Sequence, residues 1–120
     1  PKADIVIPTF KGIDKAFIDE LAQLEPFGNG NPEPILKVSG LTVLTVRRMG
    51  ADGQHVKIEV KDREGNRLQL VAFNAEPQWF VEIGETIDAW LQPTLNEWRG
   101  VQTVEARLVR LCAVGPEHKT

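Results

Sequence analysis

The sequence predicts a mainly β domain, a five-stranded Greek-key barrel with a helix ahead of it and a short helix between the third and fourth strands. Two observations support this fold class. Apolar side chains recur at every second residue in several segments of 35–111, as in half-buried strands, and they recur with helical spacing in 13–24. A chain of 120 residues that is 42% hydrophobic makes one domain and can bury its own core without a disulfide.

Residues 13–24 are expected to form the first helix. Asp14 can serve as its N-cap, and the turn-forming residues from Pro26 onward should end it. Residues 28–34 are rich in glycine, asparagine and proline and predict a loop. We therefore expect residues 1–34 to be a lead-in helix and a Pro/Gly-rich loop that pack on the barrel. The apolar face of the helix would make the contact, through Ile13, Phe17, Leu21 and Leu24.

The next segments alternate with a period of two and predict three strands, at residues 35–48, 55–61 and 67–73. The first is long and contains Gly40, which favours a bulge or a bend. Turn-forming residues at 50–53 and 63–66 separate the three strands. In the second and third strands, the side chains expected to face the core are Val56, Ile58, Val60, Leu68, Leu70 and Ala72.

Residues 74–82 predict one or two helical turns with Asn74 as a possible cap, and Gly84 closes them. A fourth strand is expected at 86–95, a tight loop at 96–100 and a fifth strand at 101–111. This order of elements is that of an OB-fold, although another small antiparallel barrel or a sandwich has not been excluded. The expected OB-fold domain spans residues 35–112, and residues 113–120 are expected to be a flexible tail.

Charge is distributed unevenly along the chain. The net charge is −3, yet between Lys37 and Arg67 seven basic residues outnumber four acidic ones. A basic central segment between acidic flanks is a possible phosphate-binding surface. On charge alone, a solvated strand face is the better explanation of the segment.

The chain lacks the residue sets of a catalytic centre. It has one serine, one cysteine and two histidines, and no spacing resembles a metal site. We therefore expect neither a cofactor nor an enzymatic activity of this chain alone. Cys112 cannot form an internal disulfide, which suits a reducing, cytoplasmic compartment. No apolar run approaches the length of a membrane span, so no membrane association is expected.

Four motifs together carry a family resemblance. They are Leu-Glu-Pro-Phe-Gly-Asn-Gly-Asn-Pro-Glu-Pro at 24–34, Gln-His-Val-Lys at 54–57, Val-Ala-Phe-Asn at 71–74 and Leu-Asn-Glu-Trp-Arg-Gly at 95–100. In this order they resemble the carboxy-terminal OB domain of RecJ-type single-stranded-DNA-specific exonucleases. The resemblance covers residues 13–112.

The resemblance implies a role in a larger enzyme. Exonucleases of this type degrade single-stranded DNA from 5′ to 3′ with a divalent metal, Mn or Mg, held by aspartate and histidine motifs in amino-terminal domains. Those motifs are absent here, and the chain does not start with Met, so it is expected to be a piece of a longer protein. It would bind single-stranded DNA and guide it to the catalytic domains of the parent chain. Alternatively, it is a structural or protein-interaction module that braces the nuclease core or docks single-stranded-DNA-binding protein.

The resemblance and the OB topology also predict where DNA would bind. OB-folds bind oligonucleotides on the face of their second and third strands, beside the loops after strands one and four. Phe73 is either a stacking platform or the end of a strand, and Trp98 either packs on the barrel or stacks on a base. Phe27 is expected to be buried. The expected DNA-binding residues are Lys57, Arg99 and Trp98, surrounded by His55, Lys61, Arg67 and Phe73.

Overall fold

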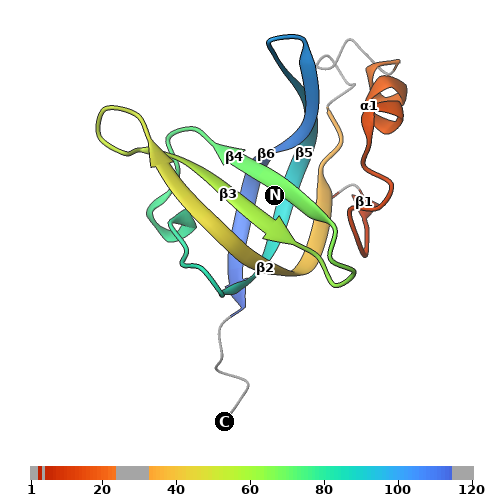
Figure 1. Ribbon diagram of the computed structural model, residues 1–120. Helices are drawn as coiled ribbons and strands as arrows, with labels where there is room; N and C mark the ends of the chain where they lie inside the picture. Colours follow the sequence, from red (N-terminus) through yellow and green to blue (C-terminus); the bar gives the residue numbers. More distant parts are fainter. Residues whose placement is uncertain (1–2, 4, 24–32, 115–120) are drawn as a thin grey trace.

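The computed structural model describes residues 3, 5–23 and 33–114 and is mainly β, as predicted (Figure 1). Six strands form one sheet, and a single α-helix lies beside it in this part of the chain. Along the chain the elements are β1 (Ile5–Val6), α1 (Lys15–Ala22), β2 (Leu36–Met49), β3 (His55–Lys61), β4 (Arg67–Ala72), the 3₁₀ helix η1 (Pro77–Trp79), β5 (Thr86–Trp98) and β6 (Val101–Val114).

The strand pairings form a closed circuit. The order across the sheet is β1-β2-β3-β4-β6-β5, and β5 also pairs with β2. The contacts between β2, β3, β4, β5 and β6 are antiparallel except for the parallel β4–β6 pair. Figure 1 shows these strands curving around a common interior, with the β5–β6 hairpin extending past the end of β4. Closure leaves β1 as the strand with a single neighbour among the described residues.

The interior of this circuit is the hydrophobic core. All six side chains predicted to face inward from the second and third predicted strands are buried, which confirms the alternation seen in the sequence. Side chains of β2, β5 and β6 complete the same cluster, including Leu36, Leu41, Ile87 and Leu91, all at 0% exposure. Burial of an aliphatic side chain contributes about 1.5–3 kcal/mol, so this cluster is the main source of stability.

The sharp bend of β2 confirms the interpretation of its interior glycine. Gly40 has a φ of 72°, a region that favours glycine because it has no Cβ. The register between β2 and β5 shifts between Val38 and Leu41, around this residue. The first part of β2, as far as Thr42, pairs with β5, whereas the part from Thr42 onward pairs with β3. The glycine therefore allows one strand to serve both neighbours.

Several predicted boundaries were wrong. The sixth strand, β1, was not foreseen, and β5 and β6 each extend three residues beyond the predicted ends. The predicted loop at 96–100 is therefore only a two-residue turn. The short helix is a single 3₁₀ turn capped at Glu76 instead of Asn74. Asn74 has a φ of 52°, which is incompatible with an extended N-cap conformation.

The lead-in helix is shorter than predicted. Asp14 is its N-cap, as expected, and its carboxylate accepts a hydrogen bond from Phe17 N–H at 2.9 Å. Ile13 and Phe17 are partly buried and pack against the core, but α1 itself has no fully buried residue. Leu24, Phe27 and the tail residues 115–120 lie outside the described residues. No helix in the described part of the chain is long and apolar enough to cross a membrane.

A buried carboxylate joins the amino-terminal segment to the β3–β4 turn. Asp62 is 4% exposed and accepts hydrogen bonds from Phe10 N–H at 2.7 Å and from Glu64 N–H at 2.9 Å. Asn66 donates two more, from its backbone N–H at 2.9 Å and its side-chain amide at 3.0 Å. Burial alone would raise the pKa of Asp62, but these hydrogen bonds outweigh it and hold the pKa below its ordinary value of 3.8.

Replacement of this carboxylate should destabilise the domain. Asp62→Ala leaves the buried Phe10 N–H without its acceptor, so we expect the free energy of unfolding to fall by about 1.5–3 kcal/mol. Urea denaturation followed by circular dichroism measures the change. Asp52→Ala, at an exposed turn position, is the control and should change stability by less than about 0.5 kcal/mol. Equal losses in the two variants would contradict the role of Asp62.

The lowered pKa also predicts a pH dependence. A carboxylate that is more acidic in the folded state stabilises the fold above its unfolded-state pKa, and this contribution is lost as the pH falls through its folded-state pKa. The stability difference between wild type and Asp62→Ala should therefore be constant near neutral pH and shrink below about pH 3.8. Urea titrations of both proteins from pH 7 to about pH 2.5 measure it. A difference that grows on acidification would refute the assignment.

Candidate nucleic-acid interface

A shallow groove lies where β4 faces the β5–β6 hairpin. Val71 and Phe73, at the end of β4, line one side of it. The other side is formed by residues 94–96 of β5 and by Glu105 and Arg107 of β6, and the open groove has a volume of about 230 Å³. The third predicted strand and the loop after the fourth thus border one groove. In an OB topology this is the face that receives oligonucleotides.

Lys57 projects from β3 beside this groove. Lys57 pairs with Val71 of β4, and Val71 in turn pairs with Arg107 of β6, so the three residues form one row across the strands. The Lys57 ammonium lies 3.9 Å from the Glu105 carboxylate, which also accepts a hydrogen bond from the Gln69 amide at 2.9 Å. Glu105 thus fixes Lys57 in place and offsets part of its charge.

Arg107 belongs to the groove although the sequence analysis did not select it. Its guanidinium donates to Gln92 Oε1 at 2.5 Å and to Glu33 Oε1 at 3.1 Å, yet its side chain remains 52% exposed. The alternation of 101–111 already placed Arg107 outward on the last strand. Arg107 was missed because the charges were counted over whole segments, and the segment that contains Arg107 is acidic overall.

His55 and Phe73 form a contact at the end of the β3–β4 pair. Their rings meet edge to face, with centroids 5.3 Å apart and an interplanar angle of 67°. His55 Nδ1 also accepts a hydrogen bond from Asn74 N–H at 2.9 Å. His55 therefore has a structural role that the sequence did not reveal. Phe73 is 64% exposed, so its ring faces solvent and is not part of the core.

Trp98 and Arg99 lie at the tip of the β5–β6 hairpin. Trp98 ends β5 and pairs with Val101, which leaves Arg99 and Gly100 as a two-residue turn. Both have positive φ, 52° and 78°, as two-residue turns of type I′ require. Trp98 is 65% exposed, and the Arg99 guanidinium carbon lies 4.3 Å from its ring centroid. The tryptophan therefore does not pack on the sheet, and one cation accompanies its ring.

Lys61 and Arg67 lie at the opposite end of the β3–β4 pair. They are cross-strand partners, and Arg67 lies 3.8 Å from the Glu59 carboxylate. Lys61 is six residues from His55 along β3, or about 20 Å at the rise of a strand. The structure thus places five of the seven predicted residues around the groove and its hairpin, and it separates Lys61 and Arg67 from them.

The described residues contain no group of three or more histidine, cysteine, aspartate or glutamate side chains that could hold a metal ion. A divalent metal of the kind that the family resemblance implies therefore finds no fitting ligand set in this part of the chain. The groove offers an aromatic ring, an arginine, an asparagine amide and the Glu105 carboxylate.

The chain is similar to known RecJ proteins. The curated single-stranded-DNA-specific exonuclease RecJ of Bacillus subtilis (strain 168) is 35% identical over 82 residues, which cover 68% of this chain and 10% of that protein. The crystal structure of RecJ in complex with Mn²⁺ from Thermus thermophilus matches 92% of this chain and 15% of its own, with 26% identity and a TM-score of 0.68.

A more distant likeness concerns the fold alone. Rim1, a mitochondrial single-stranded-DNA-binding protein of S. cerevisiae, matches 68% of this chain and 95% of its own, with 14% identity and a TM-score of 0.51. The chain thus spans about a tenth of the length of the curated RecJ protein, whereas it matches almost the whole Rim1 chain. The family model for the RecJ OB domain matches residues 4–110. The chain belongs to the RecJ OB-domain family.

Proposed function

We propose that this chain is a five-stranded OB barrel that binds single-stranded DNA in the groove between β4 and the β5–β6 hairpin. One observation carries the proposal: two aromatic side chains, Phe73 and Trp98, are each about two-thirds exposed at this groove and its hairpin. Lys57, Arg107 and Arg99 lie beside them. Exposed aromatic rings with cations beside them are the combination on which the bases of single-stranded nucleic acids stack.

Such a site would bind without sequence preference. Stacking of a base on an aromatic ring contributes about 1–3 kcal/mol, and every base has a face that can stack. Lysine and arginine would contact the phosphates, so affinity should fall with salt. Thr94 and Asn96 add polar groups to the groove along β5. Gln92 is buried, and its amide is occupied by Arg107 and by the Glu33 carbonyl.

The whole protein would use this domain to guide its substrate. The relatives' names describe an exonuclease specific for single-stranded DNA, and a relative was crystallised with Mn²⁺. We infer that 5′ to 3′ hydrolysis and the Mn or Mg ion belong to the catalytic domains of the parent protein, to which this domain delivers the strand. The single Cys112, a free thiol, fits a reducing compartment such as the cytoplasm.

A second candidate function is structural. Three cations of the β3–β4–β6 face lie beside carboxylates: Lys57 by Glu105, Arg67 by Glu59 and Arg107 by Glu33. Such compensation favours a module that braces the catalytic domains or docks a partner such as single-stranded-DNA-binding protein. Titration of a labelled oligonucleotide at low and high salt separates the two functions. A complex that weakens with salt supports DNA binding, whereas no complex at low salt supports bracing.

Substitutions in the groove should separate charge from stacking. Lys57→Ala, Arg99→Ala and Arg107→Ala should each reduce the slope of log K against log salt by about 0.7, the single-strand value per phosphate contact. Trp98→Ala should cost about 1–3 kcal/mol of binding and leave the slope unchanged. Fluorescence anisotropy with oligo-dT at several salt concentrations measures both quantities.

The matched control for this series is Lys11→Ala. Lys11 is an exposed cation of the amino-terminal segment, next to Phe10, whose N–H binds Asp62 at the far end of β3. Its removal changes the net charge equally and should leave the slope within error of wild type. If the groove variants fold and all behave like Lys11→Ala, DNA does not bind in the groove.

Release of Lys57 from its carboxylate should tighten binding. Glu105→Gln keeps the size of the side chain but removes the charge 3.9 Å from the Lys57 ammonium. Exposed ion pairs contribute about 0.2–1 kcal/mol, and this pair is partly buried, with side-chain exposures of 27% for Lys57 and 14% for Glu105, so affinity at low salt should rise about fivefold. Glu64→Gln, an exposed turn position with the same charge change, is the control. Equal effects of both variants would mean that only net charge matters.

A further inference from the structure

A second basic and aromatic cluster lies on the β2–β5–β6 side of the molecule, away from the β3–β4 face. Its members are Lys37 of β2, Trp90 of β5 and Arg110 of β6, which we call the Trp90 cluster. Lys37 pairs with Trp90, and Trp90 pairs with Arg110, so the three residues form one row across neighbouring strands. The sequence analysis did not select Trp90 or Arg110, and the groove does not include them.

Both cations of this cluster lie against the same ring. The Lys37 ammonium and the Arg110 guanidinium carbon are each 4.8 Å from the Trp90 ring centroid. The two charges are therefore less than about 10 Å apart. Like charges at this separation repel each other, and the electron-rich face of the indole offsets part of the cost. The arrangement keeps two cations close together without a carboxylate between them.

Neither cation has an acidic partner within ion-pair distance among the described residues. The nearest outward carboxylate on β5, Asp88, accepts a hydrogen bond from Gly40 N–H at 3.0 Å. Glu33 is paired with Arg107. This differs from the groove, where Lys57 and Arg107 each lie beside a carboxylate. The uncompensated positive charge of this side is therefore concentrated at the Trp90 cluster.

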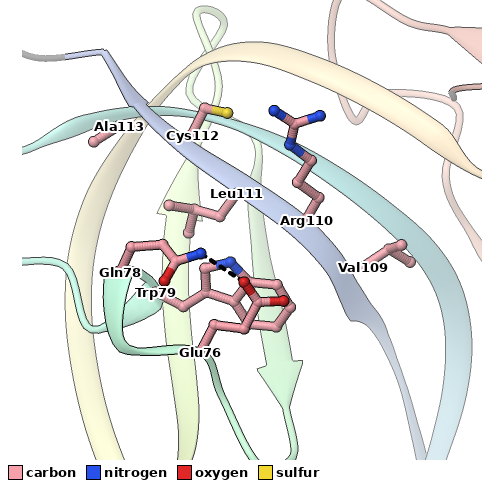
Figure 2. Close-up of a pocket in the computed structure, with 8 residues that line it drawn as sticks. All are labelled: Glu76, Gln78, Trp79, Val109, Arg110, Leu111, Cys112 and Ala113. Carbon is pink, nitrogen blue, oxygen red and sulfur yellow. Dashed lines mark hydrogen bonds between the residues drawn. The ribbon is translucent and has the colours of Figure 1, made fainter. Parts of the chain in front are cut away.

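Arg110 stands above an open pocket of about 500 Å³ (Figure 2). The figure shows its side chain on the opposite side of β6 from Leu111 and from Trp79 of η1. Glu76 also lines this pocket, but its carboxylate accepts a hydrogen bond from the Gln78 amide at 2.5 Å. Arg110 is exposed, so its guanidinium is accessible to a ligand.

A β-bulge positions Arg110 and links the cluster to the groove. The register of β5 and β6 shifts at Trp90 and Leu91, which leaves Val109 as the extra residue. Bulges often redirect a side chain in this way. Arg107, which lines the groove, precedes Arg110 by three residues, or about 10 Å along the strand. A polyanion that occupies the groove and follows β6 would next meet Arg110 and Lys37.

We propose that the Trp90 cluster is a second phosphate-binding site, which holds the backbone of a single-stranded DNA that leaves the groove along β6. The proposal deepens the proposed function and rests on it. Two cations supported by one aromatic ring suit phosphodiester groups, since each charge can contact a phosphate while the indole covers the apolar side of the sugar. A short oligonucleotide would fill only the groove, and a longer one would reach both sites.

Indole N–H signals in a ¹H–¹⁵N spectrum can test this directly, because the chain has only three tryptophans. Oligo-dT of about 5 nucleotides should shift the Trp98 signal alone, and oligo-dT of about 20 nucleotides should shift Trp98 and Trp90. Trp79 is buried and serves as the reference. Trp90→Phe and Trp98→Phe assign the signals.

A charge variant provides the second measurement. Lys37→Gln with Arg110→Gln should lower the salt slope by about 1.4 for the long oligonucleotide and leave the short one unchanged. Between about 50 and 200 mM salt, the variant should then lose about sevenfold less affinity than wild type. Lys11→Gln with Arg63→Gln removes two exposed cations elsewhere and is the matched control. Lys37→Arg with Arg110→Lys should restore the wild-type slope.

The outcomes separate the two proposals. If the long oligonucleotide shifts the Trp98 signal but not the Trp90 signal, the second phosphate-binding site is refuted, and the proposal that DNA binds in the groove still stands. The second site is also refuted if the Lys37→Gln, Arg110→Gln variant has the same salt slope as the control variant. The two cations would then only support the Trp90 ring. If neither oligonucleotide shifts any indole signal at low salt, DNA binding by this chain fails altogether.

Discussion

The bend of β2 at Gly40 is the constraint on which the other features of the structure depend. One strand must pair with β5 on both sides of the bend as far as Thr42 and with β3 from Thr42 onward, and this double pairing closes the circuit around the core. Closure fixes β6 between β4 and β5, and so sets the β5–β6 hairpin beside the end of β4. Asp88 holds the bend through its hydrogen bond to Gly40 N–H. The position of the groove between β4 and the β5–β6 hairpin therefore depends on the bend of β2 at Gly40.

The sequence predicted the parts of the fold that a local pattern determines. In β3 and β4, every second residue is apolar because one face meets the core, so their inward side chains could be predicted directly. The bounds of β3 were predicted correctly, and β4 ends one residue before the predicted end. The ends of β5 and β6 could not, because the hairpin extends beyond the core and both its faces are exposed from Asn96 to Thr103. β1 has two exposed residues and exists only through a pairing with β2, about thirty positions away. From the sequence, Asp62 is typical of a turn residue. Its buried role depends on contact with the amino-terminal segment, which no local pattern predicts.

In the candidate site, too, the sequence predicted the residues that follow a local pattern and missed those that depend on contacts between distant segments. Phe73 and Lys57 follow from the outward alternation of their strands, and Trp98 and Arg99 from their place near the last turn. The hydrogen bond that His55 accepts from Asn74 N–H could not be predicted, because Asn74 adopts a positive φ that no spacing predicts. Lys61 and Arg67 lie on the same face as Lys57. A strand of this length is longer than the reach of one nucleotide, however, so residues on one face need not belong to one site. Arg107 and Arg110 were overlooked since a segment-wide charge count hides which cations lie next to each other across strands.

The carboxylates beside the groove have a further consequence for the parent protein. Glu105 and Glu33 hold Lys57 and Arg107 in position and also lower the net charge that a phosphate meets, so the isolated domain should bind weakly. Under the proposed function, weak binding would suit a domain tethered to a nuclease, because the covalent connection would raise the effective concentration of the second site to about the millimolar range. A strand held tightly at this domain would be released slowly after each cleavage. Exposed rings for stacking, with partly compensated cations around them, instead allow the strand to be retained and still to advance.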